Sequence, residues 1–152
     1  MVKPKLNLQK FMRGTVWLVG TGPGDPGLIT LYTLHAIRQA DVIIYDALVN
    51  SEILKMAKKK AKLVFAGKRG GKPSFQQKDI SNRIVGYAKK KLRVLRLKSG
   101  DPFVFGRGAE EALKLIKEKI PFRIVPGITA GIGGIAYAGI PATYRNNNHS
   151  IT

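Results

Sequence analysis

Five loops carry the residues whose types and spacing can do chemistry, and each follows a short apolar, β-branched run. The first loop reads GTGPGDP over residues 20–26. Its three glycines allow a sharp turn and a close approach of the backbone to a ligand. The G-x-G-x-G spacing, interrupted by prolines, departs from the dinucleotide-binding fingerprint. A tight strand-to-helix turn and a ligand loop therefore explain this segment equally well.

Charge distinguishes the second and third loops. Asp46 directly follows the second apolar run, where a carboxylate can act as a base or hold a hydroxyl or amine. An Asp turn or a helix cap is the simpler explanation of a single aspartate there. Residues 67–72, GKRGGK, combine three glycines with three cations, which is typical either of an anion cradle or of a solvated basic loop.

The fourth and fifth loops mix polar and apolar residues. Residues 98–108, KSGDPFVFGRG, contain a carboxylate, an arginine and two aromatics, Phe103 and Phe105. Apolar side chains in so polar a loop indicate either a pocket wall or an anchor to the core. The fifth loop is PGITA at residues 126–130, where capping of a following helix is enough to explain Thr129.

The elements that must position these loops alternate between strand and helix. Strands are predicted at residues 15–19, 42–45, 62–65, 93–97 and 122–125. Near-continuous apolar strands with helical crossovers predict an α/β fold with a mainly parallel five-stranded sheet and helices on both faces. Ligands bind outside the carboxyl ends of such strands, which is where all five loops lie.

Helices are predicted between the strands, the first two capped by Thr30 and Ser51. The buried side of the first helix is predicted to carry Leu31, Leu34, Ala36, Ile37 and Ala40. Two further helices are predicted from helical spacing of apolar residues: Ile80, Ile84, Val85 and Ala88, and Ala109, Ala112, Leu113 and Ile116. Glu110 precedes Lys114 by four residues, which favours an ion pair between them. The Gly-, Ala- and Ile-rich segment 129–138 predicts a close-packed helix.

Composition limits the protein class. The chain has 152 residues, 44% of them apolar, and no cysteine, which predicts one globular domain and excludes disulfide scaffolds and thiolate chemistry. With two histidines, no metal site is expected. Residues 1–13 are basic and lack a continuous apolar stretch, so we expect a flexible lead-in, no membrane span and a cytoplasmic location.

The charge is strongly positive. Lys and Arg total 27 against 9 Asp and Glu, which gives a formal net charge of +18. This favours acidic partners, namely nucleic acid, an anionic membrane surface or a polycarboxylate ligand, without choosing between them. A lysine-rich solvated surface with no partner explains the number equally well.

The five loops together are far more specific than any one of them. GTGPGDPGLIT, IIYDALV, AGKRGG followed by QQ, LKSGDPFVFGRG and VPGITAGIGGIAYAGIP occur in this order between about residues 14 and 145. The set resembles the tetrapyrrole methylase family, most of all its branch that methylates uroporphyrinogen III to precorrin-2 in sirohaem and cobalamin biosynthesis. The resemblance implies S-adenosyl-L-methionine as methyl donor, S-adenosyl-L-homocysteine as product, and a homodimer of two-domain subunits.

The resemblance also assigns domains. Residues 14–145 correspond to the N-terminal domain of the family, and residues 146–152 to the start of an interdomain linker. The second domain, which would complete the cofactor cleft, is absent from this sequence. Our hypothesis is therefore that this chain alone does not turn over.

Residue roles follow from the same resemblance. Asp46 matches the family's proton acceptor and Lys68 its proton donor. The positions that match the cofactor site are Pro23, Ser99, Gly100, Asp101, Val104, Thr129 and Ala130. Because the substrate carries eight carboxylates, Arg69, Arg107 and Arg145 are candidates to bind it, since arginine binds carboxylates in a bidentate way.

Four positions depart from the family pattern. Ser99 stands where the family usually has glycine, and Ala47 where it usually has arginine. Tyr144 and Asn146 replace a histidine and an aspartate on either side of Arg145, near the expected substrate face.

Two alternatives remain open. The basic surface fits an RNA 2′-O-methyltransferase of the same superfamily, whose RNA binding would fall steeply with added salt. The second alternative is a degenerate module that binds a tetrapyrrole without catalysis. Affinity for S-adenosylhomocysteine distinguishes this module from an enzyme, because a competent half of an enzyme site should keep at least weak affinity.

Overall fold

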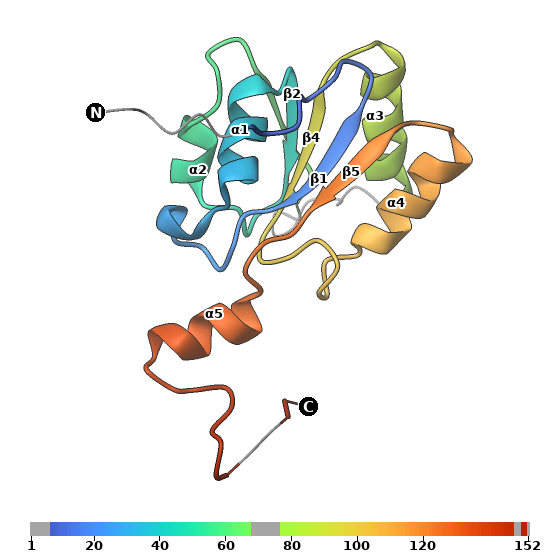
Figure 1. The fold of residues 1–152 in the computed structure, drawn as a ribbon. Helices are drawn as coiled ribbons and strands as arrows, with labels where there is room; N and C mark the ends of the chain where they lie inside the picture. The colour runs from blue at the N-terminus through green and yellow to red at the C-terminus, as the bar shows by residue number, and fades with distance from the viewer. Residues whose placement is uncertain (1–6, 68–76, 148–149, 152) are drawn as a thin grey trace, which may run out of the picture.

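A five-stranded sheet forms the centre of the molecule (Figure 1). The structure, a computed structural model, describes residues 7–67, 77–147 and 150–151. The strands are β1 (Val16–Gly20), β2 (Val42–Tyr45), β3 (Lys62–Phe65), β4 (Val94–Lys98) and β5 (Phe122–Val125), in the order β3-β2-β4-β1-β5. Every pairing in the sheet is parallel, which confirms the predicted α/β fold.

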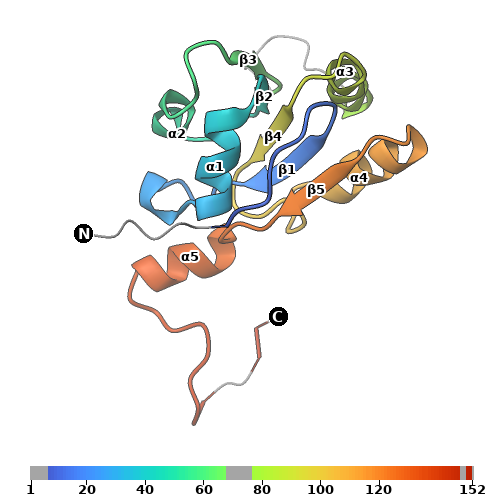
Figure 2. The same cartoon turned by 45° about the horizontal axis from the view of Figure 1, so that its top comes forward.

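Helices cover both faces of this sheet (Figure 2). The short η1 (Pro26–Leu28) leads into α1 (Leu31–Gln39), and α2 (Ser51–Lys55) lies on the same face as α1. The other face is covered by α3 (Gln77–Lys89) and α4 (Gly108–Lys117). Thr30 caps α1 as predicted, because its hydroxyl oxygen accepts the backbone N–H of Thr33 at 3.0 Å.

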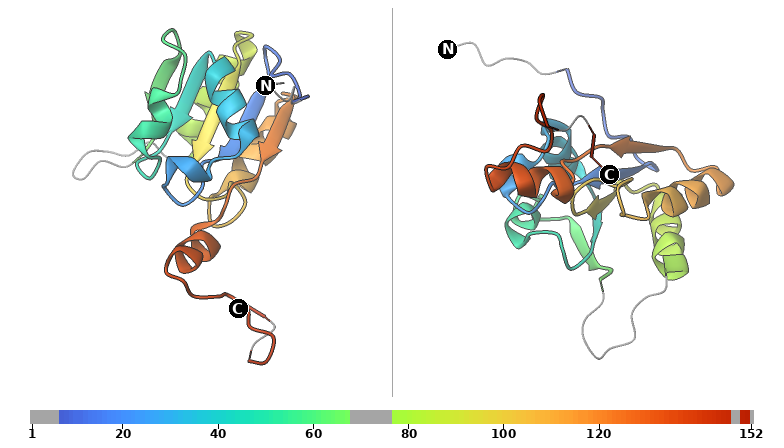
Figure 3. Two further views of the ribbon diagram at one scale, coloured as in Figure 1. Left: turned by 60° about the vertical axis from the view of Figure 1, so that its left-hand side comes forward. Right: turned by 90° about the horizontal axis from the view of Figure 1, so that it is seen from below.

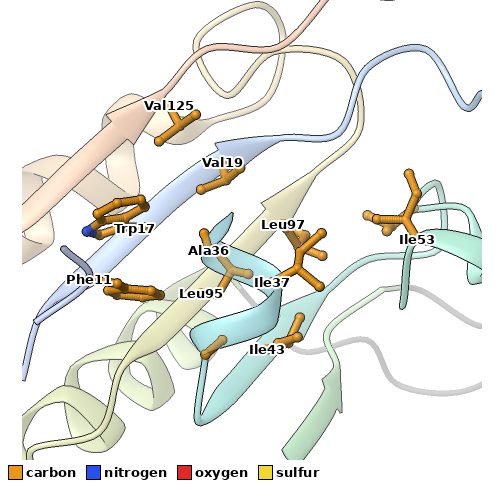
Figure 4. Close-up of a cluster of buried hydrophobic side chains, with 12 residues drawn as sticks. Phe11, Trp17, Val19, Ala36, Ile37, Ile43, Ile53, Leu95, Leu97 and Val125 are labelled. Carbon is orange, nitrogen blue, oxygen red and sulfur yellow. The ribbon is translucent and has the colours of Figure 1, made fainter. Parts of the chain in front are cut away.

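The core has two halves, one on each face of the sheet. Alternate residues of β1 and β4 point to opposite faces, so a fully buried strand supplies both halves. Trp17 and Leu95 pack with Ile37 beneath α1 and α2 (Figure 4). Leu18 and Val94 pack with α3 and α4 on the opposite face. The central strands are therefore held from both sides, which fixes the loops that follow them.

The lead-in differs from the prediction over its described part, residues 7–13. Phe11 is fully buried and its ring stacks on Trp17 with a centroid distance of 4.6 Å. The Nε–H of Arg93 donates to the carbonyl oxygen of Phe11 at 3.0 Å. The expectation of a flexible arm is wrong for this part, because one aromatic side chain in a basic segment finds a site in the core.

Two other local predictions are wrong, namely the cap of α2 and the burial of Leu31. Asn50 rather than Ser51 caps α2, and its Oδ1 accepts the backbone N–H of Glu52 at 2.9 Å. On α4, Leu113 and Ile116 are exposed, while Leu115 lies in the core. Leu31 at the start of α1 is likewise exposed.

The predicted ion pair on α4 does not form. Glu110 instead accepts two hydrogen bonds from the guanidinium of Arg107, at 2.7 and 2.8 Å. Lys114 pairs with Glu118, at 2.8 Å.

The last helix, α5 (Ala130–Tyr137), projects from the edge of the sheet where the strands end (Figure 3). Its only buried residue is Gly133, whereas Ile132 and Tyr137 are exposed. The segment is helical as predicted, but it is not close-packed within the described part of the chain. None of the described helices is long and apolar enough to span a membrane.

Candidate functional site

The first and fourth loops join at the carboxyl edge of the sheet through a pair of glycines. The backbone N–H of Gly100 donates to the carbonyl oxygen of Gly22 at 2.7 Å, and Gly22 N–H donates back to Gly100 at 3.2 Å. Gly22 and Gly100 have φ angles of +73° and +64°, a left-handed conformation that favours glycine. Glycine at these two positions therefore allows the loops to meet.

The fifth loop reaches the same place and leaves no room for side chains there. A methyl group on Gly127 would lie 2.2 Å from the carbonyl oxygen of Gly100, and one on Gly20 would lie 2.4 Å from the same atom. The ends of β1, β4 and β5 thus approach each other backbone to backbone. Strand order explains this, because β4 and β5 flank β1.

Asp101 ties the fourth loop to the fifth. Its Oδ1 accepts the backbone N–H of Phe103 at 2.8 Å, and its Oδ2 accepts the backbone N–H of Gly127 at 3.0 Å. Both carboxylate oxygens are engaged with the backbone, so Asp101 holds the two loops in register. The sequence marked Asp101 as a cofactor position, and the structure adds this bridging contact.

Thr129 and Ala130 stand where the fifth loop enters α5. Thr129 occupies the N-cap position, but its side chain makes no capping hydrogen bond, so capping does not explain it. A methyl group on Gly100 would lie 3.5 Å from the backbone nitrogen of Ala130. The start of α5 is thus next to the Gly22–Gly100 bridge, and Ala130 is exposed.

Pro23 and Asp25 connect the first loop to α5. A methyl group on Gly133 would lie 2.9 Å from the Cγ of Pro23, so the proline ring packs directly on the helix. The hydroxyl of Tyr137 donates to the Oδ2 of Asp25 at 2.8 Å. The backbone N–H of Gly27 and this hydroxyl lower the pKa of Asp25, and the same hydrogen bond raises the pKa of Tyr137.

Asp46 lies after β2, which is next to β4 in the sheet. Its Oδ1 accepts the backbone N–H of Leu48 at 3.2 Å, which is the predicted Asp turn. Its Oδ2 accepts an N–H from the Nη2 of Arg96 at 3.4 Å. The side chain is 26% exposed, so the carboxylate keeps lone pairs that an incoming group can reach.

Sequence reasoning missed a buried ionic group behind Asp46. The Nε of Arg96 and the Nζ of Lys98 both lie near the Oε1 of Glu111, at 3.1 and 3.3 Å. Burial, followed by the positive charge of Arg96, lowers the pKa of Lys98. The available signal was the alternation V-L-R-L-K in a strand of a sheet predicted to be covered on both faces, since two cations on one face of such a strand need buried acidic partners.

The remaining predicted residues are spread more widely. Ser99 is half-buried before Gly100, and Val104 is exposed farther along the fourth loop. Arg107 is exposed, and its two hydrogen bonds to Glu110 raise the pKa of its guanidinium. Arg145 is exposed beyond α5. Lys68 and Arg69 lie outside the described residues.

The two aromatics of the fourth loop do not anchor it to the core. Phe103 is more than half exposed and Phe105 is fully exposed. Phe105 and Arg107 also have positive φ angles, of 51° and 56°. Backbone strain of this kind is often kept at functional sites.

Comparisons with known proteins agree with this geometry. The family model described as Tetrapyrrole (Corrin/Porphyrin) Methylases matches residues 15–152. This chain belongs to the tetrapyrrole methylase family. A uroporphyrinogen-III C-methyltransferase from Sinorhizobium sp. is 67% identical over 140 residues, which cover 92% of this chain and 50% of that protein.

Two further family relatives extend the comparison. A siroheme synthase from Actinobacillus pleuropneumoniae is 53% identical over 147 residues, covering 97% of this chain and 30% of that protein. The crystal structure of uroporphyrin-III C-methyl transferase from Thermus thermophilus, complexed with S-adenosylhomocysteine, has a TM-score of 0.76 and 38% identity, covering 90% of this chain and 56% of that one. The chain thus spans 50% and 30% of the length of the two curated relatives, from Sinorhizobium and Actinobacillus.

Proposed function

We propose that this chain forms the N-terminal α/β domain, residues 14–145, of an S-adenosylmethionine-dependent methyltransferase that converts uroporphyrinogen III to precorrin-2. Residues 146–152 begin the linker to a second domain. The observation that carries the proposal is the meeting of three backbone loops around Gly100 at the carboxyl edge. The identity to the Sinorhizobium methyltransferase supports a tetrapyrrole substrate over RNA.

The residues at this edge fit a charged sulfur nucleoside. Such a ligand needs apolar contact surface with a few fixed polar groups. Pro23, Val104 and Ala130 supply apolar atoms, while the backbone at Ser99–Gly100 and the hydroxyl of Thr129 supply polar ones. Asp101 keeps the fourth and fifth loops at a fixed separation. Glycine at position 100 allows a ligand to approach the backbone closely.

The reaction needs little acid–base catalysis from the protein, because the methyl donor is already activated. The bound sulfonium supplies an activated methyl group. A pyrrole carbon forms the new bond to that methyl as the bond from methyl to sulfur breaks, and the sulfur keeps the electron pair. Positive charge then develops on the macrocycle, and a proton must leave it. Asp46 stabilises that charge and accepts the proton, and Lys68 is the residue at the position of the family's proton donor.

Arginines supply the contacts to the substrate carboxylates. Arg69 belongs to the third loop and Arg107 to the fourth, and Arg145 follows α5; in our proposal all three bind substrate carboxylates. Arg107 already donates to Glu110, so a substrate carboxylate must compete with that partner. Bidentate pairing with a carboxylate suits this exchange.

Apolar side chains are exposed next to the proposed cofactor site. Ile132 and Tyr137 on α5 are exposed, as is Val104 in the fourth loop. In our proposal a second domain covers these apolar side chains and closes the cofactor site, and two such subunits form a homodimer. The isolated chain therefore binds S-adenosylhomocysteine weakly and does not turn over.

Calorimetric titration with S-adenosylhomocysteine tests the cofactor site. Gly100→Ala is the test variant and Gly14→Ala the matched control, because both glycines have positive φ, of +64° and +76°, but lie at opposite edges of the sheet. We expect Gly100→Ala to weaken binding by about tenfold, equivalent to about 1.4 kcal/mol, and Gly14→Ala to leave it unchanged. Equal affinities in all three proteins would contradict the proposal.

A methylation assay tests the reaction. The chain and the Sinorhizobium relative are incubated separately with S-adenosylmethionine and uroporphyrinogen III. The masses of the products are then measured by mass spectrometry. We expect two added methyl groups with the relative and none with the chain alone. Turnover by the chain at the rate of the relative would refute the need for a second domain. Salt-sensitive RNA binding without affinity for S-adenosylhomocysteine would favour the RNA enzyme.

A further inference from the structure

A buried ionic group stands directly behind the carboxylate of Asp46. Arg96 and Lys98 lie two residues apart on β4, so their side chains share one face of the sheet. Ile44 of β2 pairs with Arg96 in the sheet register, and Asp46 follows Ile44 by two residues on the same face. The side chains of Arg96, Lys98 and Glu111 are 4%, 5% and 0% exposed. Asp46 is the member of the group that reaches the surface.

The guanidinium of Arg96 is fixed by three contacts. Its Nε donates to the Oε1 of Glu111 at 3.1 Å, and its Nη1 donates to the carbonyl oxygen of Leu97 at 2.8 Å. Its Nη2 donates to the Oδ2 of Asp46 at 3.4 Å. Because the guanidinium is planar and rigid, two fixed nitrogens determine where the third one points. The third points at the proposed proton acceptor.

Charge pairing favours the same interpretation. Two cations, Arg96 and Lys98, face two carboxylates, Glu111 and Asp46, in this group. Buried charges persist when each has a partner, and removing one partner leaves another uncompensated. Lys98 alone gives Glu111 a cation. Arg96 is therefore a second buried cation on the strand, and its additional acidic partner is Asp46 at the carboxyl edge of the sheet.

We propose that Arg96 is a positioning residue for Asp46, and that Glu111 acts through Arg96 by holding its guanidinium. Leu48 N–H fixes one oxygen of the Asp46 carboxylate and Arg96 fixes the other. The plane of the carboxylate is then set, with its remaining lone pairs toward solvent. This inference rests on the proposed function, in which Asp46 accepts the proton that leaves the macrocycle after methylation.

A competing explanation is that the Asp turn alone fixes Asp46 and that Arg96 only joins α4 to the sheet. The two explanations differ in the rotamer of Asp46. Three-bond couplings between its Hα and Hβ atoms, measured by NMR on the labelled chain, report the rotamer populations directly. The measurement needs no cofactor, substrate or second domain.

The test variant is Arg96→Met, which leaves Lys98 beside Glu111. We expect one dominant Asp46 rotamer in the unchanged chain. In Arg96→Met the ratio of this rotamer to the others falls by about fivefold, as expected when one charge-assisted hydrogen bond is lost. Arg96→Lys keeps a buried cation for Glu111 but offers one nitrogen in place of three, so it shows the same loss and decides the question if Arg96→Met does not fold.

Arg93→Met is the matched control. Arg93 also pairs with an aspartate, Asp41, at 3.5 Å, but at the other end of β4. Its removal lowers the melting temperature without changing the Asp46 couplings. An unchanged Asp46 rotamer ratio in a folded Arg96 variant, or an equal change in Arg93→Met, would overturn the proposal.

The outcome is separable from that of the proposed function. If the chain fails to bind S-adenosylhomocysteine while the Asp46 rotamer still depends on Arg96, the methyltransferase assignment fails and the positioning contact stands. If the chain binds S-adenosylhomocysteine and the Asp46 rotamer populations do not change in the Arg96 variants, only the positioning role fails.

Discussion

The two ends of β4 carry the same pair of residue types in different settings. Arg93 pairs with Asp41 at 3.5 Å at the amino edge, and Arg96 pairs with Asp46 at 3.4 Å toward the carboxyl edge. Asp41 also accepts hydrogen bonds from Lys58 at 2.6 Å and from Arg93 N–H at 2.9 Å. Burial alone would raise the pKa of Asp41, but these contacts outweigh it and lower the pKa.

The number of partners indicates a structural role for Asp41 and a functional role for Asp46. Asp41 has a lysine, an arginine and a backbone N–H around it, so it links three segments and has little capacity left. Asp46 has one backbone N–H and one guanidinium N–H, and it remains partly exposed. Residue type alone does not distinguish the two aspartates, whereas the number of partners does.

The distribution of charge follows the same division. The lysine-rich segments 58–60, 89–91 and 117–119 each precede a strand, so they lie at the amino edge. Cations in these places lie at or after the carboxyl ends of helices, where they complement the helix dipole. Much of the net charge of +18 therefore lies away from the candidate site and does not argue for a polyanionic substrate there.

The largest expected effect comes from the buried ionic group. Glu111→Ala leaves Arg96 and Lys98 without their shared carboxylate, and we expect it to lower the free energy of unfolding by about 3–5 kcal/mol. Glu118→Ala at the amino edge removes two partly exposed ion pairs, with Lys89 and Lys114, and should change stability far less. Urea denaturation of both variants makes the measurement. Equal losses would show that the two edges do not differ in this way.

Close backbone packing at the carboxyl edge gives the next effect. Gly127→Ala places a methyl group 2.2 Å from the carbonyl oxygen of Gly100, and overpacking of this kind costs about 1–3 kcal/mol. Gly131→Ala in α5 is the control, because nothing lies within 4 Å of the added methyl group. We expect the control to be stabilised by up to about 1 kcal/mol, since alanine favours the helix. Thermal denaturation distinguishes the two.

The link between Asp25 and Tyr137 should have a smaller, local effect. Tyr137→Phe removes the hydroxyl that donates to Asp25 at 2.8 Å, so α5 should open more often. Hydrogen exchange at the amides of α5 is expected to speed up while exchange in β1 and β4 is unchanged. Protection in α5 equal to that of the unchanged protein would show that Pro23 alone holds the helix.

The smallest effect concerns acid stability at the amino edge. Hydrogen bonds from Lys114 and Lys89 lower the pKa of Glu118 from 4.5 to about 2. Because the folded pKa lies below the unfolded one, the stabilisation is complete above pH 4.5 and is lost as the pH falls toward about 2. Glu118→Gln should therefore flatten the fall of the melting temperature over that range. An unaltered slope would rule out this contribution.

Much of the fold is readable from the sequence because burial on both faces gives apolar strands. The runs at 42–45, 62–65 and 122–125 have the bounds of β2, β3 and β5. Helix faces are harder to predict, because apolar residues of α4 lie on more than one side: Leu113 and Ile116 are exposed, whereas Leu115 is buried. Phe11 was missed because a single aromatic in a basic segment carries no periodic signal.

The candidate site is predictable in its parts and less so in its contacts. The loops around Gly100 follow from strand ends and glycine spacing, and Asp46 follows from its place after β2. The contacts of Asp46 with Arg96 and of Asp101 with Gly127 join segments 50 and 26 residues apart, and no local pattern encodes them. The unfilled cap at Thr129 likewise depends on the tertiary position of α5.

The most direct test of the central claim is an NMR titration of the labelled 152-residue chain with S-adenosylhomocysteine. We expect saturable shifts in the amide signals of Gly100, Asp101 and Ala130, with those of Gly14 and Arg93 at the opposite edge unchanged. Shifts at the amino edge, or none at the carboxyl edge at millimolar ligand, would contradict the claim that the three joined loops form half of a nucleoside site.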